Sequence, residues 1–248
     1  MYKKNVHTRA MAVAIFAGAL LVTSCQKDAL VKNQTQTADQ VLAAAAKKNP
    51  TDQPPTSGND DAFDAELDAV MHSWNERMNA AMANMTCEPD VEFAKMQIMH
   101  HQMGVDMANV ALKYEHHKEG IKLTEKSRDA NLKSIDRLQR CLEKHSTDIT
   151  LSPEQCTAFK NEMMREMMLM QQASEAALHQ NDRNDADVDF SEVIIQHHKG
   201  AIAMSAIELE YGHDQCMLTE ASKLIKEQSK EIEDFSEFKR THVYPSTL

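Results

Sequence analysis

The chain has 248 residues, a formal net charge of −11 at pH 7, and 17 methionines but only one tryptophan. This acidic balance disfavours binding to nucleic acid or to an anionic lipid surface, and it suits either a cationic partner or simple solubility. The folded part has few glycines or prolines and many Met, Ala, Glu, Lys and Gln residues, which predicts an all-α protein.

The N-terminus has the pattern of a bacterial lipoprotein signal. Basic residues come first, and Ala10–Val22 is an apolar stretch that is too short to span a bilayer. It leads into "LVTSC", where small residues precede Cys25, as in the motif whose cysteine is lipidated. We predict a signal peptide over 1–24, lipidation of Cys25, and an extracytoplasmic protein anchored to a bacterial membrane on its periplasmic or outer-membrane side. The alternative is an ordinary signal peptide with a chance cysteine.

Residues 25–61 form a predicted flexible tether. They are rich in Gln, Asn, Thr, Asp and Pro and lack aromatic residues, so they cannot bury enough apolar surface to offset the entropy of ordering. Residues 62–244 are sufficient for one folded domain. Within this domain "SPEQ" at 152–155 predicts a capping box at a helix start. The pattern predicts about six helices, at 62–86, 90–117, 121–146, 153–180, 187–212 and 216–242.

The predicted domain contains an internal repeat. The segment from Asp90 aligns without gaps with the segment from Asp187, with ten identities in 28 positions at a spacing of 97 residues. Looser similarity continues into the following helices, so the two pseudo-repeats cover about 90–146 and 187–242. Short loops between successive helices predict an up-and-down antiparallel bundle.

This doubled pattern resembles the ferritin-like family known as domain of unknown function 305, which includes CopM-like periplasmic copper-binding proteins. The resemblance rests on the acidic residue, phenylalanine, paired histidines and methionine of each copy and on the helix ending "EQSKEIEDF". It covers roughly 90–242 and implies a ferritin-like four-helix bundle and a role in copper tolerance. The helix at 62–86 lies outside its clearest part.

The first histidine pair lies among methionines in a way that suits metal binding. Met96, His100, Met103 and Met107 are spaced four, three and four residues apart, so they share one face of a helix. His101 follows His100 directly and serves in this interpretation as a neighbouring ligand. A lone buried histidine is usually just hydrogen-bonded, but two such pairs on duplicated helices favour ligation.

The second copy is a poorer site because it keeps only His197, His198 and Met204. Further thioethers elsewhere in the chain either complete the sites or fill an irregular core, which methionine does well. These are Met71, Met78, Met82, Met85, Met163, Met164, Met167, Met168 and Met170.

The ligand chemistry predicts the metal. Thioethers are soft and uncharged, and they favour Cu(I) and, by the same softness, Ag(I) over Zn²⁺, Mg²⁺ or Ca²⁺. Imidazole must be neutral to coordinate, so with ordinary histidine pKa values binding would weaken as pH falls through about 6 to 7. The predicted function is copper sequestration or delivery by a membrane-tethered protein, with a copper ion as partner and no organic cofactor.

Two other classes of function compete with this hypothesis. A ferritin-like di-iron oxidase needs a Glu-x-x-His motif on each of two helices. Glu210 and His213 have this spacing, but the equivalent pair is Lys113 and His116, so no symmetric carboxylate set exists and an enzyme is disfavoured. A structural or interaction lipoprotein without metal remains the main alternative, and metal titration with and without the paired histidines distinguishes the two.

The four remaining cysteines are even in number, as expected for disulfides in an oxidising compartment. In an up-and-down bundle, Cys87, Cys141, Cys156 and Cys216 all fall at the same end. We predict the pairs Cys87–Cys141 and Cys156–Cys216, although four cysteines allow three connectivities and buried free thiols are the alternative.

Overall fold

The computed structural model describes residues 57–146, 149–180 and 185–242, and within these ranges it contains six α-helices and no strand. They are α2 (Ser57–Ala83), α3 (Pro89–Tyr114), α4 (Lys118–Lys144), α5 (Pro153–Gln180), α6 (Ala186–Tyr211) and α7 (Gln215–His242). The predicted all-α bundle is confirmed. The predicted signal peptide, Cys25 and most of the predicted tether lie outside the described residues.

Helix bounds differ from those predicted by a few residues, most at the first helix. α2 begins at Ser57, within the range assigned to the tether, and ends at Ala83, because the composition changes gradually here and does not mark a helix start. The predicted capping box is confirmed: the Ser152 N–H donates to Gln155 Oε1 and the Gln155 N–H donates to Ser152 Oγ, both at 3.3 Å. In the described part of the chain, no helix combines the length and the apolar character that a membrane span requires.

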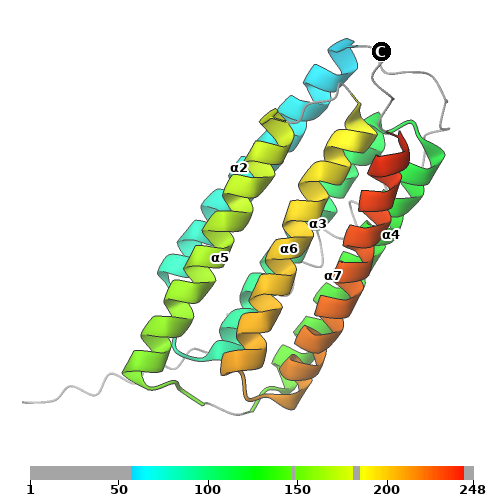
Figure 1. The fold of residues 1–248 in the computed structure, drawn as a ribbon. Coiled ribbons are helices and arrows are strands. Elements are labelled where there is room, and N and C mark those ends of the chain that lie inside the picture. The colour runs from blue at the N-terminus through cyan, green and yellow to red at the C-terminus, as the bar shows by residue number, and fades with distance from the viewer. Residues whose placement is uncertain (1–56, 147–148, 181–184, 243–248) are drawn as a thin grey trace, which may run out of the picture. The chain divides into compact units, whose positions relative to one another are not determined.

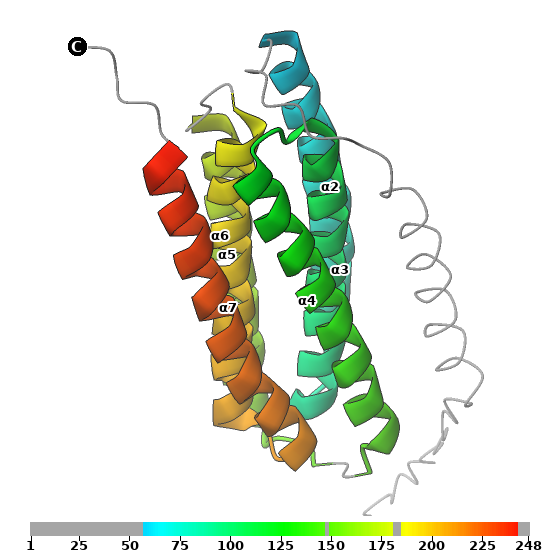
Figure 2. The same ribbon diagram turned by 90° about the vertical axis from the view of Figure 1, so that its right-hand side faces the viewer.

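The six helices form three layers of two helices each (Figure 1 and Figure 2). α3 and α6 pack together in the middle layer, α4 and α7 cover one side of it, and α2 and α5 cover the other. Each half of the chain therefore supplies one helix to every layer. Because they are covered on two sides, α3 and α6 bury residues around most of their circumference, whereas α4 and α7 bury a single stripe.

The two spaces beside the middle layer have different chemistry. Between the middle layer and α2 and α5 lies one apolar cluster that includes eleven methionines. On the other side, the buried stripe of α4 is polar over most of its length: Thr124, Ser127, Asn131 and Ser134 all face inward. The middle helices thus separate a sulfur-rich layer from a polar layer.

The duplication extends to the first helix, which the sequence comparison had left outside the repeat. Phe159 and Glu162 of α5 stand 96 residues after Phe63 and Glu66 of α2. Tyr114 packs on Phe63 with ring centroids 5.8 Å apart and donates to Glu66 at 2.9 Å. Tyr211 repeats both contacts, with Phe159 at 5.6 Å and Glu162 at 2.9 Å. α5 is therefore the counterpart of α2, and the repeat unit has three helices.

The first turn of each middle helix is tied to the loop that follows the other. The Asp187 carboxylate accepts the backbone N–H groups of His116 and His117 at 2.9 and 3.2 Å. At the opposite end of the bundle, Asp90 accepts those of His213 and Asp214 at 2.9 and 2.7 Å. These equivalent contacts satisfy loop donors at both ends and hold α3 antiparallel to α6.

The predicted disulfide pairing is wrong, although all four cysteines do lie at one end. The disulfides are Cys87–Cys156 and Cys141–Cys216, with Cα–Cα distances of 5.2 and 5.6 Å. The reason is lateral packing: α2 lies beside α5 and α4 beside α7, whereas α2 and α4 are in opposite outer layers. Each bridge therefore joins the two halves of the chain instead of closing one half.

Digestion of the unreduced protein should release peptides that link Cys87 to Cys156 and Cys141 to Cys216, identified by mass spectrometry. The bridges span sequence separations of 69 and 75 residues, so each is expected to contribute about 2–4 kcal/mol to the free energy of unfolding. The double replacement Cys141→Ser and Cys216→Ser should lower that free energy accordingly. A peptide linking Cys87 to Cys141 would contradict this pairing.

Candidate metal centre

The structure buries all eight predicted metal ligands in the middle layer of the bundle. Their side chains are at most 1% exposed: Met96, His100, His101, Met103, Met107, His197, His198 and Met204. The four methionines belong to the sulfur-rich layer beside α2 and α5. The histidines lie between α3 and α6 and toward α4 and α7, so the two kinds of predicted ligand occupy adjoining regions.

The histidine pairs meet at the contact between α3 and α6. The rings of His100 and His197 are stacked, with centroids 3.7 Å apart and an interplanar angle of 23°. This approach requires small residues: a Cβ added at Gly104 would lie 2.8 Å from Cε1 of His197. One added at Gly200 would lie 3.2 Å from Nε2 of His100 and 2.6 Å from Cγ of Met170. Met170 of α5 therefore reaches the histidine pair, a role that its spacing in the sequence did not reveal.

The histidines of the second copy are oriented through one ring nitrogen. Nε2 of His197 lies 2.9 Å from the His100 carbonyl oxygen. Nε2 of His198 lies 2.9 Å from a Glu231 carboxylate oxygen and 3.3 Å from Ser127 Oγ. An acceptor on one ring nitrogen fixes a ring's orientation and leaves the other nitrogen available, as is common for metal-binding histidines. Glu231 of α7 was not predicted to contact these histidines. The signal in the sequence was on the neighbouring helix α4, where polar residues at helical spacing in 124–134 indicate a polar interior.

Most of the ring nitrogens make no well-aligned hydrogen bond. Of the eight in these four rings, six make no well-aligned hydrogen bond among the described residues, although the His100 ring also interacts with the backbone of His197. They are both nitrogens of His100, both of His101, and Nδ1 of His197 and of His198. Buried polar atoms are normally paired, so such a concentration in one place calls for an explanation.

Burial also determines the protonation of these rings. Loss of hydration lowers the pKa of His101 to about 3, helped by the positive charges of His198 and Arg137. The same cause, together with the neighbouring histidines, lowers the pKa of His100 and of His197 well below the usual value. For Glu231, burial acts to raise the pKa, but the hydrogen bond and charge of His198 outweigh it and leave the pKa below its usual value.

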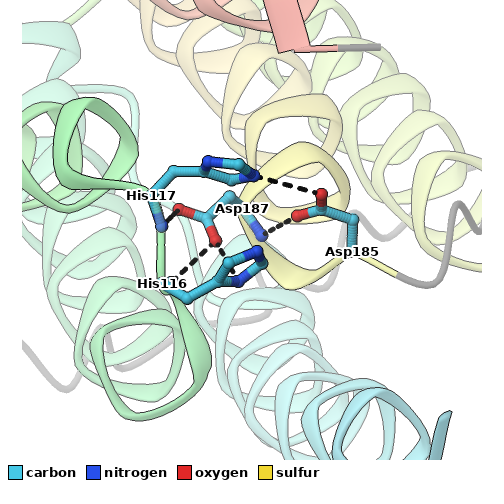
Figure 3. Close-up of side chains that lie close together, drawn as sticks. All are labelled: His116, His117, Asp185 and Asp187. Carbon is cyan, nitrogen blue, oxygen red and sulfur yellow. Dashed lines mark hydrogen bonds and ion pairs between the residues drawn. The ribbon is translucent and has the colours of Figure 1, made fainter. Parts of the chain in front are cut away.

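A second cluster lies at one end of the bundle (Figure 3) and was not predicted. Ligand atoms of His116, His117, Asp185 and Asp187 all lie within 4.8 Å of one another. In the described parts of the chain, no other three or more His, Cys, Asp or Glu side chains converge in this way, the four central histidines included. Burial raises the pKa of Asp187 to about 7, against hydrogen bonds from the backbone of His116 and His117. The signal in the sequence was a third histidine pair beside a helix end.

The lowered pKa of His101 can be tested through the pH dependence of the free energy of unfolding. Its folded pKa of about 3 lies below the ordinary value of about 6.5, so its contribution to stability is present above pH 6.5 and is lost as pH falls toward 3. Between pH 7.5 and 5 this loss is about 2 kcal/mol. In metal-free protein, His101→Gln should remove that part of the pH dependence of the free energy of unfolding, measured with urea. Equal pH dependence in parent and variant would contradict a buried neutral ring.

Comparison with known proteins gives a family but no activity. The sequence matches the family described as "Domain of unknown function (DUF305)" over residues 90–239, a range that includes both histidine pairs and both central helices. No curated protein and no solved structure matches the chain. The matched range is more than half of the sequence, and the chain therefore belongs to the DUF305 family.

Proposed function

We propose that this protein binds Cu(I), and by the same chemistry Ag(I), where α3 contacts α6, and that it sequesters or delivers copper in copper tolerance. The observation that carries the proposal is the set of six buried ring nitrogens that make no well-aligned hydrogen bond among the described residues. Leaving a buried polar group unpaired costs about 1–3 kcal/mol. In a neutral imidazole one ring nitrogen carries a proton, so each of the four rings offers one lone pair. A metal ion that binds these lone pairs would offset part of that cost.

The protonation state of the rings supports coordination. The pKa values of His100, His101 and His197 are lowered, so these rings are neutral at pH 7, which is the form that binds a metal. Because these pKa values are low, protons compete only weakly with the metal for the ring nitrogens, even at a pH below 6. The pH dependence expected from ordinary histidine pKa values is accordingly revised: Cu(I) binding at the His100 and His101 site should persist below the range of about 6 to 7.

The donor set favours a soft ion. The central histidines do not bring three nitrogens together, as an all-nitrogen Zn²⁺ site would require. Sulfur lies next to them instead, because Met170 and His100 both pack against Gly200. Met103 and Met107 lie one and two turns along the same helix from His100 and are buried in the sulfur-rich layer. Imidazole with thioether is a donor combination that suits Cu(I).

The stacked rings favour two ions over one. The lone pair of an imidazole nitrogen lies in the plane of its ring, and the planes of His100 and His197 are nearly parallel at 3.7 Å. Their lone pairs therefore point along separate planes and do not converge on a common ion. Each repeat would hold its own ion, with His100 and His101 in one site and His197 and His198 in the other.

A surface groove between α4 and α7 reaches the edge of the polar layer. This groove of about 460 Å³ is lined in part by Glu231, whose carboxylate contacts His198. Basic residues also line it, but acidic partners reduce their charge: Arg137 pairs with Glu220 and Glu227. The net charge of −11 favours the approach of cations in general.

The di-iron alternative receives no support from the positions of its residues. Glu210 and His213, the pair with Glu-x-x-His spacing, are both exposed and do not face the bundle interior. The extracytoplasmic location proposed from the signal pattern agrees with the two disulfides, which persist in oxidising compartments.

The histidine pairs should be tested by anaerobic Cu(I) titration against a chromophoric chelator. Replacing His100 and His101 with asparagine should lower Cu(I) affinity at least about tenfold, as should the same change at His197 and His198. The double replacement Met103→Leu and Met107→Leu removes sulfur with little change in volume, so it should lower affinity while costing under about 1.5 kcal/mol of stability per site.

Met82→Leu is the matched control, because Met82 is buried in the same layer but lies near the end of α2. It should leave Cu(I) affinity unchanged. If both histidine variants and their combination bind Cu(I) like the parent while remaining helical by circular dichroism, the histidines are structural and the non-metal alternative holds.

Membrane anchoring is tested separately through Cys25. If this cysteine carries lipid, Cys25→Ala should move the protein from the membrane fraction to the soluble fraction after cell lysis, because the thioether-linked anchor is lost. Unchanged fractionation, measured by immunoblot, would rule out the proposed lipoprotein anchor without bearing on copper binding.

A further inference from the structure

The cluster at the end of the bundle has the composition of a site for a divalent transition-metal ion. His116 and His117 lie in the connection between α3 and α4, and Asp185 and Asp187 lie at the start of α6 (Figure 3). We propose that these four side chains bind one ion of the Zn²⁺ class, separate from the proposed Cu(I) sites, and that this ion joins the two halves of the bundle.

The four donor atoms lie within 4.8 Å of one another, and two of their distances are close to those of a tetrahedral site. In such a site with metal–ligand distances of about 2.0–2.2 Å, neighbouring donors are about 3.4 Å apart. Nδ1 of His116 lies 3.0 Å from Oδ2 of Asp187, and Nε2 of His117 lies 3.5 Å from Oδ2 of Asp185. Two imidazoles with two carboxylates suit Zn²⁺, and the two negative charges balance a divalent cation. None of the four side chains offers sulfur, so Cu(I) is disfavoured here.

Asp185 divides its two oxygens between structure and the proposed site. Oδ1 caps α6 by accepting the backbone N–H groups of Asp187 and Val188 at 3.1 and 3.4 Å. Oδ2 is buried, and its contact in the structure is the His117 ring, with Nε2 at 3.5 Å. A buried carboxylate oxygen needs a strong partner, and a contact of 3.5 Å with one imidazole is long for a hydrogen bond. Helix capping alone does not account for this oxygen.

The other end of the bundle serves as an internal comparison. Asp90 there makes the same two backbone contacts as Asp187. In the repeat alignment Asp214 stands where His117 does, and Glu88 where Asp185 does, so the His₂Asp₂ set is present at one end only. The fold thus ties its loops without these ligands. The imidazole of His117 and the carboxylate of Asp185 are therefore not needed for the contact between the first helical turn and the loop.

The position of the cluster gives the ion a structural role. Both disulfides lie at the opposite end, where they join the two halves. His116 and His117 belong to the first half, and Asp185 and Asp187 to the second. An ion bound by all four would link the halves at the end that, within the described residues, has no disulfide.

The test is Zn²⁺ titration of the chelator-stripped full chain by calorimetry, with thermal unfolding in parallel. The parent should bind Zn²⁺ and show a higher Tm with it, because a ligand that binds only the folded state stabilises that state. Asp185→Asn keeps a capping oxygen and His117→Asn keeps the backbone N–H, so both variants should fold. Each should weaken Zn²⁺ binding at least about tenfold, and the double variant should lose the Tm increase.

His213→Asn is the matched control, since His213 is the repeat equivalent of His116 at the other end; it should leave Zn²⁺ binding unchanged. Cu(I) titration of the double variant should equal that of the parent, which separates this site from the central histidines. The proposal is overturned if the stripped parent takes up no Zn²⁺, or if the double variant binds Zn²⁺ with the affinity of the parent.

Discussion

The direct packing of α3 against α6 is the contact on which the rest of this structure depends. Gly104 and Gly200 leave room for it, and the rings of His100 and His197 stack where side chains of ordinary size would hold the helices apart. Because both helices are covered on two sides, these rings are removed from water. Loss of hydration lowers their pKa values, and most of their nitrogens make no well-aligned hydrogen bond within the described residues. The chemistry of the interior is thus a consequence of one helix contact.

The middle helices also decide which donors meet. Each presents one side to the sulfur-rich layer beside α2 and α5 and the other to the polar layer beside α4 and α7. Soft sulfur and neutral nitrogen therefore adjoin at a dry boundary, although the residues come from distant parts of the chain. A methionine core alone would be ordinary packing. What distinguishes this one is the presence of four buried imidazoles beside it.

The two halves of the chain share the contacts that position their helices, and they differ at the residues around the candidate sites. The Asp90 and Asp187 contacts and the Tyr114 and Tyr211 contacts are nearly the same in both halves. Positions that need not match for folding have changed: His198 faces Glu231 on α7, whereas the equivalent position on α4 is Ser134. Disulfides link the halves at one end, and the His₂Asp₂ cluster lies at the other. Two similar halves have thereby acquired ends and sites of different chemistry.

Features that depend on near neighbours could be predicted from the sequence alone: the six helices, the capping box at Ser152, the repeat, and two histidine pairs able to face the bundle interior or its edge. Helical periodicity and capping act over a few residues, so they are readable without a structure. Other features became visible only once the helices were packed: which cysteines pair, that α5 is the counterpart of α2, and that His117 meets Asp185. The tertiary structure also decided the lowered histidine pKa values. Those features depend on which helices lie side by side and how much water they exclude, and neither quantity is encoded in local spacing.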